Sequence, residues 1–206
     1  MRAEVITSAQ NSKIKLLLEL QEKSKTRKKE GLFVVEGRRE LLHCIEAGYV
    51  PFAVFFCPEI IVDGEAAVIA HTLDVPPQNA AAGGKLPLAI EVPQQLYDKV
   101  AYRGGTEGVV AEMYCKDLSL DSLKLKDNPL IVVLESVEKP GNLGAVLRSA
   151  DASGVDAVIV CDPLTDMYNP NLIRSSIGAI FTVPTATASS EETIKWLKAN
   201  KIKIYT

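Results

Sequence analysis

The segment Asn128–Val160, NPLIVVLESVEKPGNLGAVLRSADASGVDAVIV, decides the fold of this chain. Pro129–Leu134 is an apolar run of strand length, and Val155–Val160 is a second one. Between them, apolar residues recur at the spacing of one buried helical face: Leu143, Val146, Leu147 and Ala150. Gly154 supplies a stop for that helix. The segment therefore predicts strand, helix and strand in an open α/β sheet.

One arginine projects from the predicted helix. Arg148 lies off the apolar face, one turn after Gly144, and helical side chains lean toward the helix N-terminus. We expect its guanidinium to pass over Gly144 toward Asn142, which we predict to be the helix N-cap. Ligands bind at the carboxyl ends of strands in open α/β sheets, where this helix begins. On spacing alone, an ordinary βαβ unit with a surface arginine is the alternative.

The stretch from Pro140 to Val160 resembles the first signature of the SpoU/TrmH family of RNA ribose 2′-O-methyltransferases, in the SPOUT class. Asn142 and Arg148 match the asparagine and arginine of that signature. The resemblance implies S-adenosylmethionine as cofactor, RNA as substrate and a homodimer. It also implies that Arg148 and Asn142 are catalytic residues.

Arg148 can act in two ways under this resemblance. A general base conflicts with the pKa of arginine, which lies above about 12. We favour a cation that binds the 3′ phosphate or the developing oxyanion; proton abstraction by a strongly perturbed arginine stays open. We expect Asn142 to orient Arg148 or the ribose.

A second segment, CDPLTDMYNPNLIRSSIGAIFTVPT, resembles the second signature of the family. It matches at Ser176, Gly178 and Ala179, which makes Ser176 and Gly178 weak candidates for cofactor binding. The alternative for Ser176 is a serine at a helix end that bonds to the backbone. Asn169 and the proline after it predict the start of a helix.

The composition is that of a globular protein, with 47% hydrophobic and 24% charged residues in 206. No apolar stretch reaches membrane-spanning length, and no leader opens the chain. The four cysteines form no CxxC pair, and the two histidines lack metal-ligand spacing. We expect a cytoplasmic protein with reduced thiols, no metal site and no membrane contact.

The net charge of −3 conceals a basic region. Residues 13–39 contain nine Lys or Arg and four Glu, a local charge of +5, which leaves −8 for the remainder. A basic patch on an acidic protein indicates an anionic partner such as nucleic acid; a solvated loop is the alternative. The expected RNA-binding residues are Lys25, Arg27, Lys28, Lys29, Arg38 and Arg39.

The chain divides into an RNA substrate-binding domain (1–115), a polar linker (116–128) and a methyltransferase domain (129–206). The first half resembles the small substrate-binding domain of TrmH-like proteins, which is similar to ribosomal RNA-binding proteins with α/β/α layers. Its motifs are weaker than the segment around Arg148, and we interpret the Ala- and Pro-rich loop around Asn79 as an insertion. This similarity to ribosomal RNA-binding proteins favours ribosomal or transfer RNA as the substrate.

Several further elements follow from local signals. We expect Ser8 or Thr7 to cap the first helix, Ile180–Val183 to form a strand, and Ser189 to cap a last helix with Ile194 and Leu197 inward. Lys201–Tyr205 is expected to be the final strand.

The third signature of the family, Gly-x-Glu with a later Ser-Leu-Asn, has no match before Thr206. In that family this part of the chain makes a trefoil knot and holds the cofactor, so we expect the knot to be missing and these 206 residues to be inactive by themselves. The overall expectation is a two-domain α/β protein with a SPOUT-type parallel sheet.

Three other functions compete with this interpretation. A non-catalytic RNA-binding module fits the basic region equally well. The second is a Rossmann enzyme, but this chain lacks the GxGxxG motif of that class and has no acidic residue directly after the second strand. Nothing specific supports a purely structural partner protein.

Overall fold

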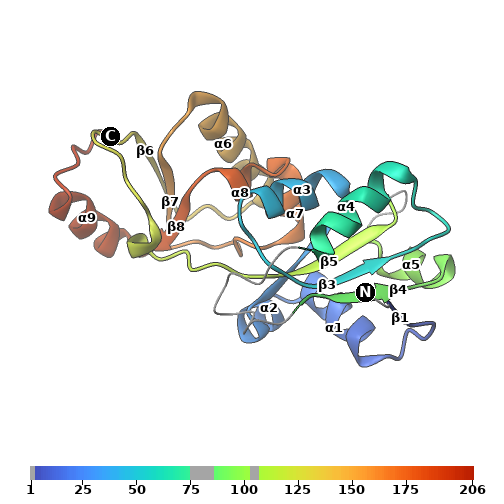
Figure 1. Cartoon of the computed structure of the whole chain (residues 1–206). Helices are drawn as coiled ribbons and strands as arrows, with labels where there is room; N and C mark the ends of the chain where they lie inside the picture. Colours follow the sequence, from blue (N-terminus) through green and yellow to red (C-terminus); the bar gives the residue numbers. More distant parts are fainter. Residues whose placement is uncertain (1–2, 75–85, 103–106) are drawn as a thin grey trace. The chain divides into compact units, whose positions relative to one another are not determined.

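The computed structural model describes residues 3–74, 86–102 and 107–206. The chain divides into two compact units, Met1–Cys115 and Lys116–Thr206, which Figure 1 colours from blue to yellow-green and from yellow to red. The loop around Asn79 lies outside the described residues.

A five-stranded mixed sheet forms the middle layer of the first unit. Its strand order is β1-β4-β3-β5-β2. Strands β1, β4 and β3 are parallel, and β5 runs antiparallel to its neighbours β3 and β2. The strands are β1 (Glu4–Val5), β2 (Leu32–Glu36), β3 (Pro51–Phe56), β4 (Leu88–Glu91) and β5 (Val109–Tyr114).

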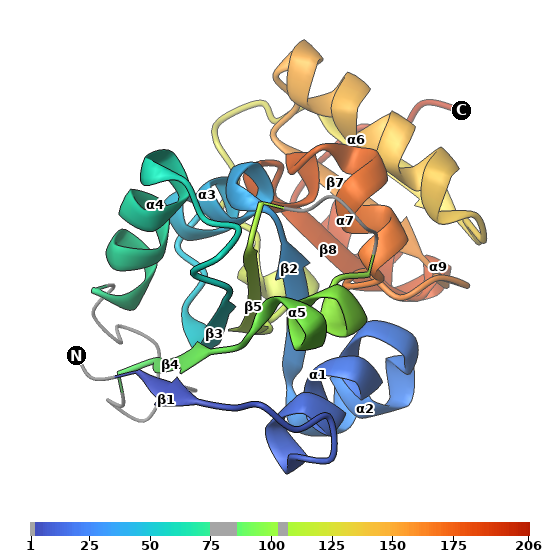
Figure 2. The same cartoon turned by 90° about the vertical axis from the view of Figure 1, so that its right-hand side faces the viewer.

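Helices cover both faces of this sheet. Figure 2 shows α1, α2 and α5 on one face and α3 and α4 on the other, so the predicted α/β/α layering is confirmed. The helices are α1 (Ser12–Glu22), α2 (Ser24–Glu30), α3 (Arg38–Glu46), α4 (Asp63–Leu73) and α5 (Gln94–Val100).

Helix α1 anchors the core of the first unit. Ile14, Leu17 and Leu20 are fully buried against the sheet. The side chain of Asn11 caps the helix by accepting from the amide of Lys13, at 2.9 Å. The cap predicted at Ser8 or Thr7 is therefore wrong, because Asn11 offers the same acceptor closer to the first buried turn.

The second unit is built on a three-stranded parallel sheet of order β6-β7-β8. This confirms the predicted parallel-sheet α/β fold. Helices α6, α7 and α8 pack on one another, and α9 packs on β7. The elements are β6 (Ile131–Glu135), α6 (Pro140–Ser153), β7 (Ala157–Cys161), α7 (Pro170–Ser176), α8 (Ala179–Thr182), β8 (Thr185–Ala188) and α9 (Ser190–Ala199).

Three predictions for the end of the chain are wrong. The mostly apolar run expected as a strand forms α8, and the strand β8 starts only after Pro184; so short a run does not distinguish a strand from a buried helical turn. Residues 201–206 have no strand pairing, and Ile194 is 45% exposed while Thr193 is buried. The cap at Ser189 is confirmed.

Part of the expected linker belongs to the second unit. Leu120, in a 3-10 turn (Leu120–Ser122), joins the core cluster of Ile159 and Leu197. The carbonyl of Leu118 accepts from the amide of Thr187 at 2.7 Å, and the hydroxyl of Tyr168 contacts the backbone of Lys116. Residues 116–123 are therefore ordered by tertiary contacts that their polar sequence does not reveal.

Candidate functional site

Helix α6 begins three residues earlier than predicted. Pro140 occupies its first position, and Lys139 is the N-cap in an extended conformation. Proline favours the first helical position, and it bars the residue before it from helical geometry. Asn142 lies inside the first turn. Its backbone N–H donates to the carbonyl of Lys139 at 3.0 Å, and its side chain is exposed. The prediction of Asn142 as N-cap is therefore wrong.

Helix α6 packs tightly against α7 at Gly144. A Cβ atom at this position would lie 2.8 Å from the backbone carbonyl carbon of Ser175. The hydroxyl of Ser175 donates to the carbonyls of Pro140 and Leu172, each at 3.1 Å. The space above Gly144 is therefore filled by α7 and is not a passage for an arginine side chain.

Arg148 is exposed, and its guanidinium donates to the carbonyl of Ser175. The predicted direction toward Asn142 is wrong, because Ser175 offers an acceptor on the adjacent helix. The fold thus brings Arg148 to the second matched segment through Ser175, a residue that the sequence analysis missed. Its only sequence signal is its place beside Ser176.

Ser176 and Gly178 form the turn between α7 and α8. The hydroxyl of Ser176 is buried, donates to the carbonyl of Ile173 at 2.8 Å and accepts from the amide of Ile180 at 3.4 Å. Ile177 and Gly178 both have left-handed backbone, with φ of +54° and +85°. Ser176 therefore serves the helix end, which favours the structural alternative for this residue.

A polar network at the carboxyl ends of the strands was also missed. Glu135 ends β6, Asp162 follows β7, and Ser190 opens α9 after β8. The hydroxyl of Ser190 contacts Glu135 Oε1 at 2.9 Å and Asp162 Oδ2 at 2.7 Å, and its amide donates to the same Asp162 oxygen. Three strands separated in sequence thus contribute to one edge, which is where open α/β sheets bind ligands.

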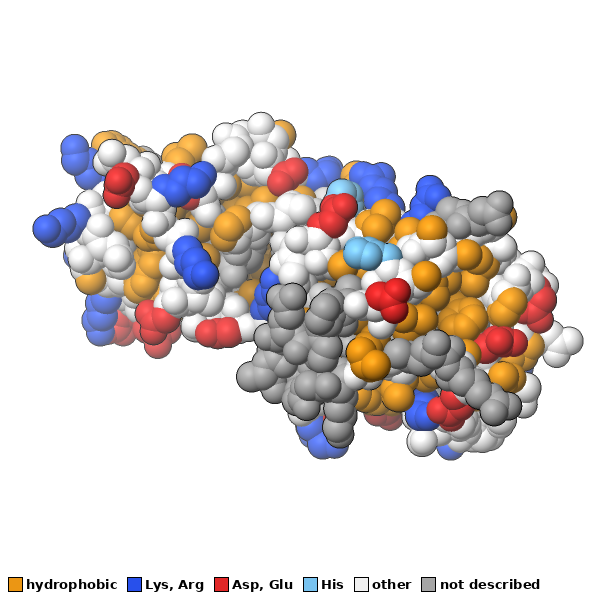
Figure 3. Space-filling view, viewed as in Figure 1, with side chains coloured by type: hydrophobic (Ala, Val, Ile, Leu, Met, Phe, Trp, Pro, Cys, Tyr) orange, Lys and Arg blue, Asp and Glu red, His pale blue; other side chains and the backbone are white. Residues whose placement is uncertain are grey.

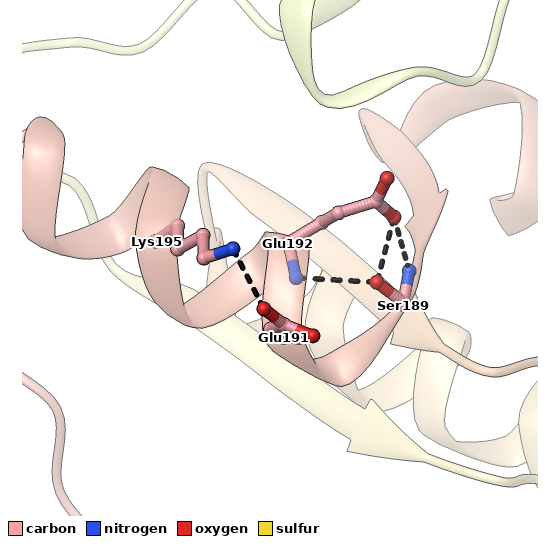
Figure 4. A network of polar contacts seen from close by, with 4 residues as sticks. All are labelled: Ser189, Glu191, Glu192 and Lys195. Carbon is pink, nitrogen blue, oxygen red and sulfur yellow. Dashed lines mark hydrogen bonds and ion pairs between the residues drawn. The ribbon is translucent and has the colours of Figure 1, made fainter.

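Hydrogen bonds favour the charged form of Asp162 at this edge. The hydroxyl and amide of Ser190 hold the pKa of Asp162 below its usual value. The start of α9 is fixed by a capping box, drawn in Figure 4, in which Ser189 and Glu192 bond reciprocally. The amide and hydroxyl of Ser189 lower the pKa of Glu192. The edge therefore suits a ligand that donates hydrogen bonds.

The described residues contain no cluster of His, Cys, Asp and Glu that would hold a metal ion. All four cysteines are free, and three of them are buried. Among the described residues, no helix is long and apolar enough to cross a bilayer.

The basic region of the first unit is helical. Five cations lie in or beside α2, which Gly31 ends in a left-handed conformation with φ of +64°. Arg27 is only 3% exposed, and its guanidinium donates to the carbonyls of Leu20 and Gln21, the latter at 3.1 Å. The expectation that Arg27 binds RNA conflicts with this position, because its charge satisfies the last carbonyls of α1.

The other predicted cations of the first unit remain accessible. Lys25, Lys28 and Lys29 are exposed, and an ion pair with Glu30 raises the pKa of Lys29. Arg38 and Arg39 begin α3, directly after β2. On the face drawn in Figure 3, described basic side chains are scattered among acidic ones rather than gathered in one patch.

Comparison with known families separates the same two parts of the chain. Residues 129–206 match the SpoU rRNA Methylase family, and residues 11–111 match the MRM3-like substrate binding domain.

Individual relatives agree with both matches. The chain is 28% identical over 202 residues to the 23S rRNA (guanosine(2553)-2′-O)-methyltransferase RlmP of Bacillus subtilis, covering 97% of this chain and 71% of that protein. A solved RNA 2′-O ribose methyltransferase is 33% identical with a TM-score of 0.73, over 96% and 70% of the two chains. An AdoMet-bound rRNA methyltransferase from Sinorhizobium meliloti shares the fold, with a TM-score of 0.77 at 24% identity over 96% and 69%.

Proposed function

The chain belongs to the SpoU rRNA methylase family, and from this premise we propose that it transfers a methyl group from S-adenosylmethionine to a ribose 2′-hydroxyl of ribosomal RNA. The observation that carries the proposal is the tandem of a substrate-binding domain and a methylase domain along one chain. Relatives named for 23S rRNA favour ribosomal over transfer RNA.

We assign charge stabilisation to Arg148. Guanidinium has five N–H donors, and the carbonyl of Ser175 occupies one nitrogen of it. The remaining donors can bind a 3′ phosphate or the oxyanion that develops as the hydroxyl loses its proton. This role favours ionisation of the hydroxyl without asking arginine to lose its own proton. Asn142 is exposed in the first turn of α6. We propose that it orients the ribose and does not orient Arg148.

S-adenosylmethionine, when bound, supplies a methyl group that its sulfonium already activates. We place this cofactor at the edge formed by Glu135 and Asp162. A carboxylate has about four acceptor positions, so each retains capacity beyond its bond to Ser190 for the amino and hydroxyl groups of the cofactor. The hydroxyl of Ser176 does not fit this task, because it is buried and already bonded.

We further propose that substrate binding falls to the first unit, through Lys25, Lys28 and Lys29 of α2 with Arg38 and Arg39. We also propose that the protein is a homodimer and acts in the cytoplasm. The four free cysteines support a reducing compartment. Light scattering of the purified protein measures the oligomeric state directly.

The test is methyl transfer to 23S rRNA by the purified protein, followed by mapping of the modified nucleotide. We expect transfer to one ribose 2′-oxygen. A protein that binds the same RNA tightly but transfers no methyl group would instead support the alternative, a non-catalytic RNA-binding module.

A further inference from the structure

The first unit carries an acidic side chain in the middle of its core sheet. Glu112 of β5 is 1% exposed, although the strand residues around it are apolar. It is paired across the sheet with Val34 of β2 and Ala53 of β3, so these side chains share the face that α1 covers. Among the described residues, its Oε1 atom has no hydrogen-bond partner. Buried polar groups are normally satisfied, which makes this carboxyl a functional candidate.

A β-bulge places an aromatic wall beside this carboxyl. The register of β3 on β5 shifts between Pro51 and Ala53. The extra residue, Phe52, packs against the core of the α1 face, and its ring lies edge-on to Tyr114 with centroids 5.7 Å apart. Bulges next to binding sites serve to redirect a side chain in this way.

Glu112 and Phe52 line an open cavity of about 190 Å³. This is smaller than the roughly 300–1,000 Å³ of sites for drug-sized ligands, and it suits a single ring system. The other walls are mostly apolar, whereas Ser12 and Lys13 are at least partly exposed and mark its opening. The lining is completed by Leu16, Ala53, Leu88 and Ile90.

We propose that this cavity binds one unpaired guanine base of the RNA substrate, with Glu112 as the residue that recognises it. The inference rests on the proposed function, since it adds a base-reading site to the substrate-binding unit. Guanine carries two adjacent donors, N1–H and the N2 amino group, and the ionised carboxylate of Glu112 accepts both with its two oxygens, so binding of the base requires this buried carboxyl to release its proton. Single-stranded bases are read in this manner, by stacking on aromatic rings and by bonds to their pairing edge. Lys13 also lines the cavity, and its ammonium is ion-paired with Glu4.

Two RNA oligomers that differ by one amino group test this proposal. Both are oligouridylates of equal length; one has a central guanosine and the other a central inosine, which lacks the N2 amino group. Their phosphates are identical, so the ratio of their dissociation constants isolates the base. We expect the guanosine oligomer to bind at least about tenfold more tightly, since a bidentate base contact discriminates on this scale.

Variants assign the ratio to the cavity. Glu112→Met should reduce the ratio to about one and should not lower the melting temperature, because it removes a buried unpaired polar group. Glu112→Gln, which keeps the shape, should also lose the preference. The triple variant Lys25→Ala, Lys28→Ala and Lys29→Ala should weaken both oligomers and keep the ratio.

Equal binding of the two oligomers by the folded protein would overturn the inference, as would a ratio that survives in both Glu112 variants. Either result leaves the proposed function intact if methyl transfer to 23S rRNA is observed. Failure of methyl transfer with a preserved guanosine preference would instead support the guanine site and overturn the proposed function.

Discussion

At the scale of single residues, Arg148 has a fixed position without being buried. Its guanidinium is held by Ser175, while the buried face of α6 consists of other residues. Arg148→Ala should cost at most about 1 kcal/mol of stability, the scale of one exposed hydrogen bond. It should reduce methyl transfer by a factor on the order of 100 or more, as loss of a charge partner in the transition state does.

Single-turnover methylation together with melting of each variant measures both effects. Arg148→Lys is the matched variant; it keeps the charge and loses the planar fork, so we expect little recovery of rate. Near-normal transfer by folded Arg148→Ala protein would reduce Arg148 to a surface arginine.

Glu112 makes stability depend on pH. Burial raises the pKa of Glu112 to about 8, above the ordinary glutamate value of the unfolded chain. The folded state therefore holds a proton that the unfolded state has released, and the stability contributed by this proton is lost as pH rises from about 4.5 to 8. Relative to Glu112→Gln, the wild-type protein should lose on the order of 3 kcal/mol between pH 5 and pH 8.

Hydrogen exchange of the β5 amides follows the unfolding of this sheet. The other titrating groups are common to both proteins, so their contribution cancels in the difference. Parallel pH profiles for wild type and Glu112→Gln would show that the Glu112 carboxyl is hydrated or paired in solution.

At the scale of elements, the contact between α6 and α7 depends on Gly144. Alanine there would gain up to about 1 kcal/mol of helix propensity, but its Cβ would meet the backbone of Ser175. Displacing that backbone costs roughly 1–3 kcal/mol, so Gly144→Ala should be destabilising on balance. It should also reduce methyl transfer, because the displaced backbone of Ser175 carries the carbonyl that holds Arg148.

Gly141→Ala is the matched control in the same helix, since nothing beyond the neighbouring residues and backbone of that helix lies within 4 Å of a Cβ there. We expect it to be neutral or stabilising. Fluorescence of Trp196, the single tryptophan of the chain, reports unfolding of the second unit. Equal stabilities of the two alanine variants would contradict the close packing at Gly144.

At the scale of the whole molecule, RNA affinity and chemistry should separate between the two units. Each neutralised phosphate contributes about 0.7–0.9 to the salt slope of RNA binding. The triple alanine variant of Lys25, Lys28 and Lys29 should therefore flatten the slope by about 2 for 23S rRNA fragments. At saturating RNA the methylation rate should change little.

Lys198→Ala, Lys201→Ala and Lys203→Ala together remove the same charge from exposed positions of the second unit. This control should leave the slope nearly unchanged. A slope that responds equally to both triple variants would assign RNA binding to the net charge rather than to α2. Arg27 is omitted because its loss would disturb the end of α1.

Local signals in the chain are sufficient for much of this architecture. Gly154 and Gly31 end helices in left-handed conformations, and Asn169 starts one before a proline. Such signals act within a few residues, through backbone sterics and caps, so they can be recognised without the fold. The same holds for Leu143, Leu147 and Ala150 on the buried face of α6, whereas Val146 is only partly buried, and for the exposure of Arg148. The family resemblance extended these signals to a function.

Only the tertiary structure shows which distant groups meet. The burial of Arg27, the approach of Ser175 to Gly144 and the meeting of Glu135, Asp162 and Ser190 join residues from separate elements. Side-chain type and spacing carry no information on these contacts, because the packing of helices on sheets selects them. Glu112 is the clearest case: in sequence it is one acidic residue in an apolar strand, and only the sheet register and the covering α1 make it a buried carboxyl beside a cavity, with one oxygen unpaired among the described residues.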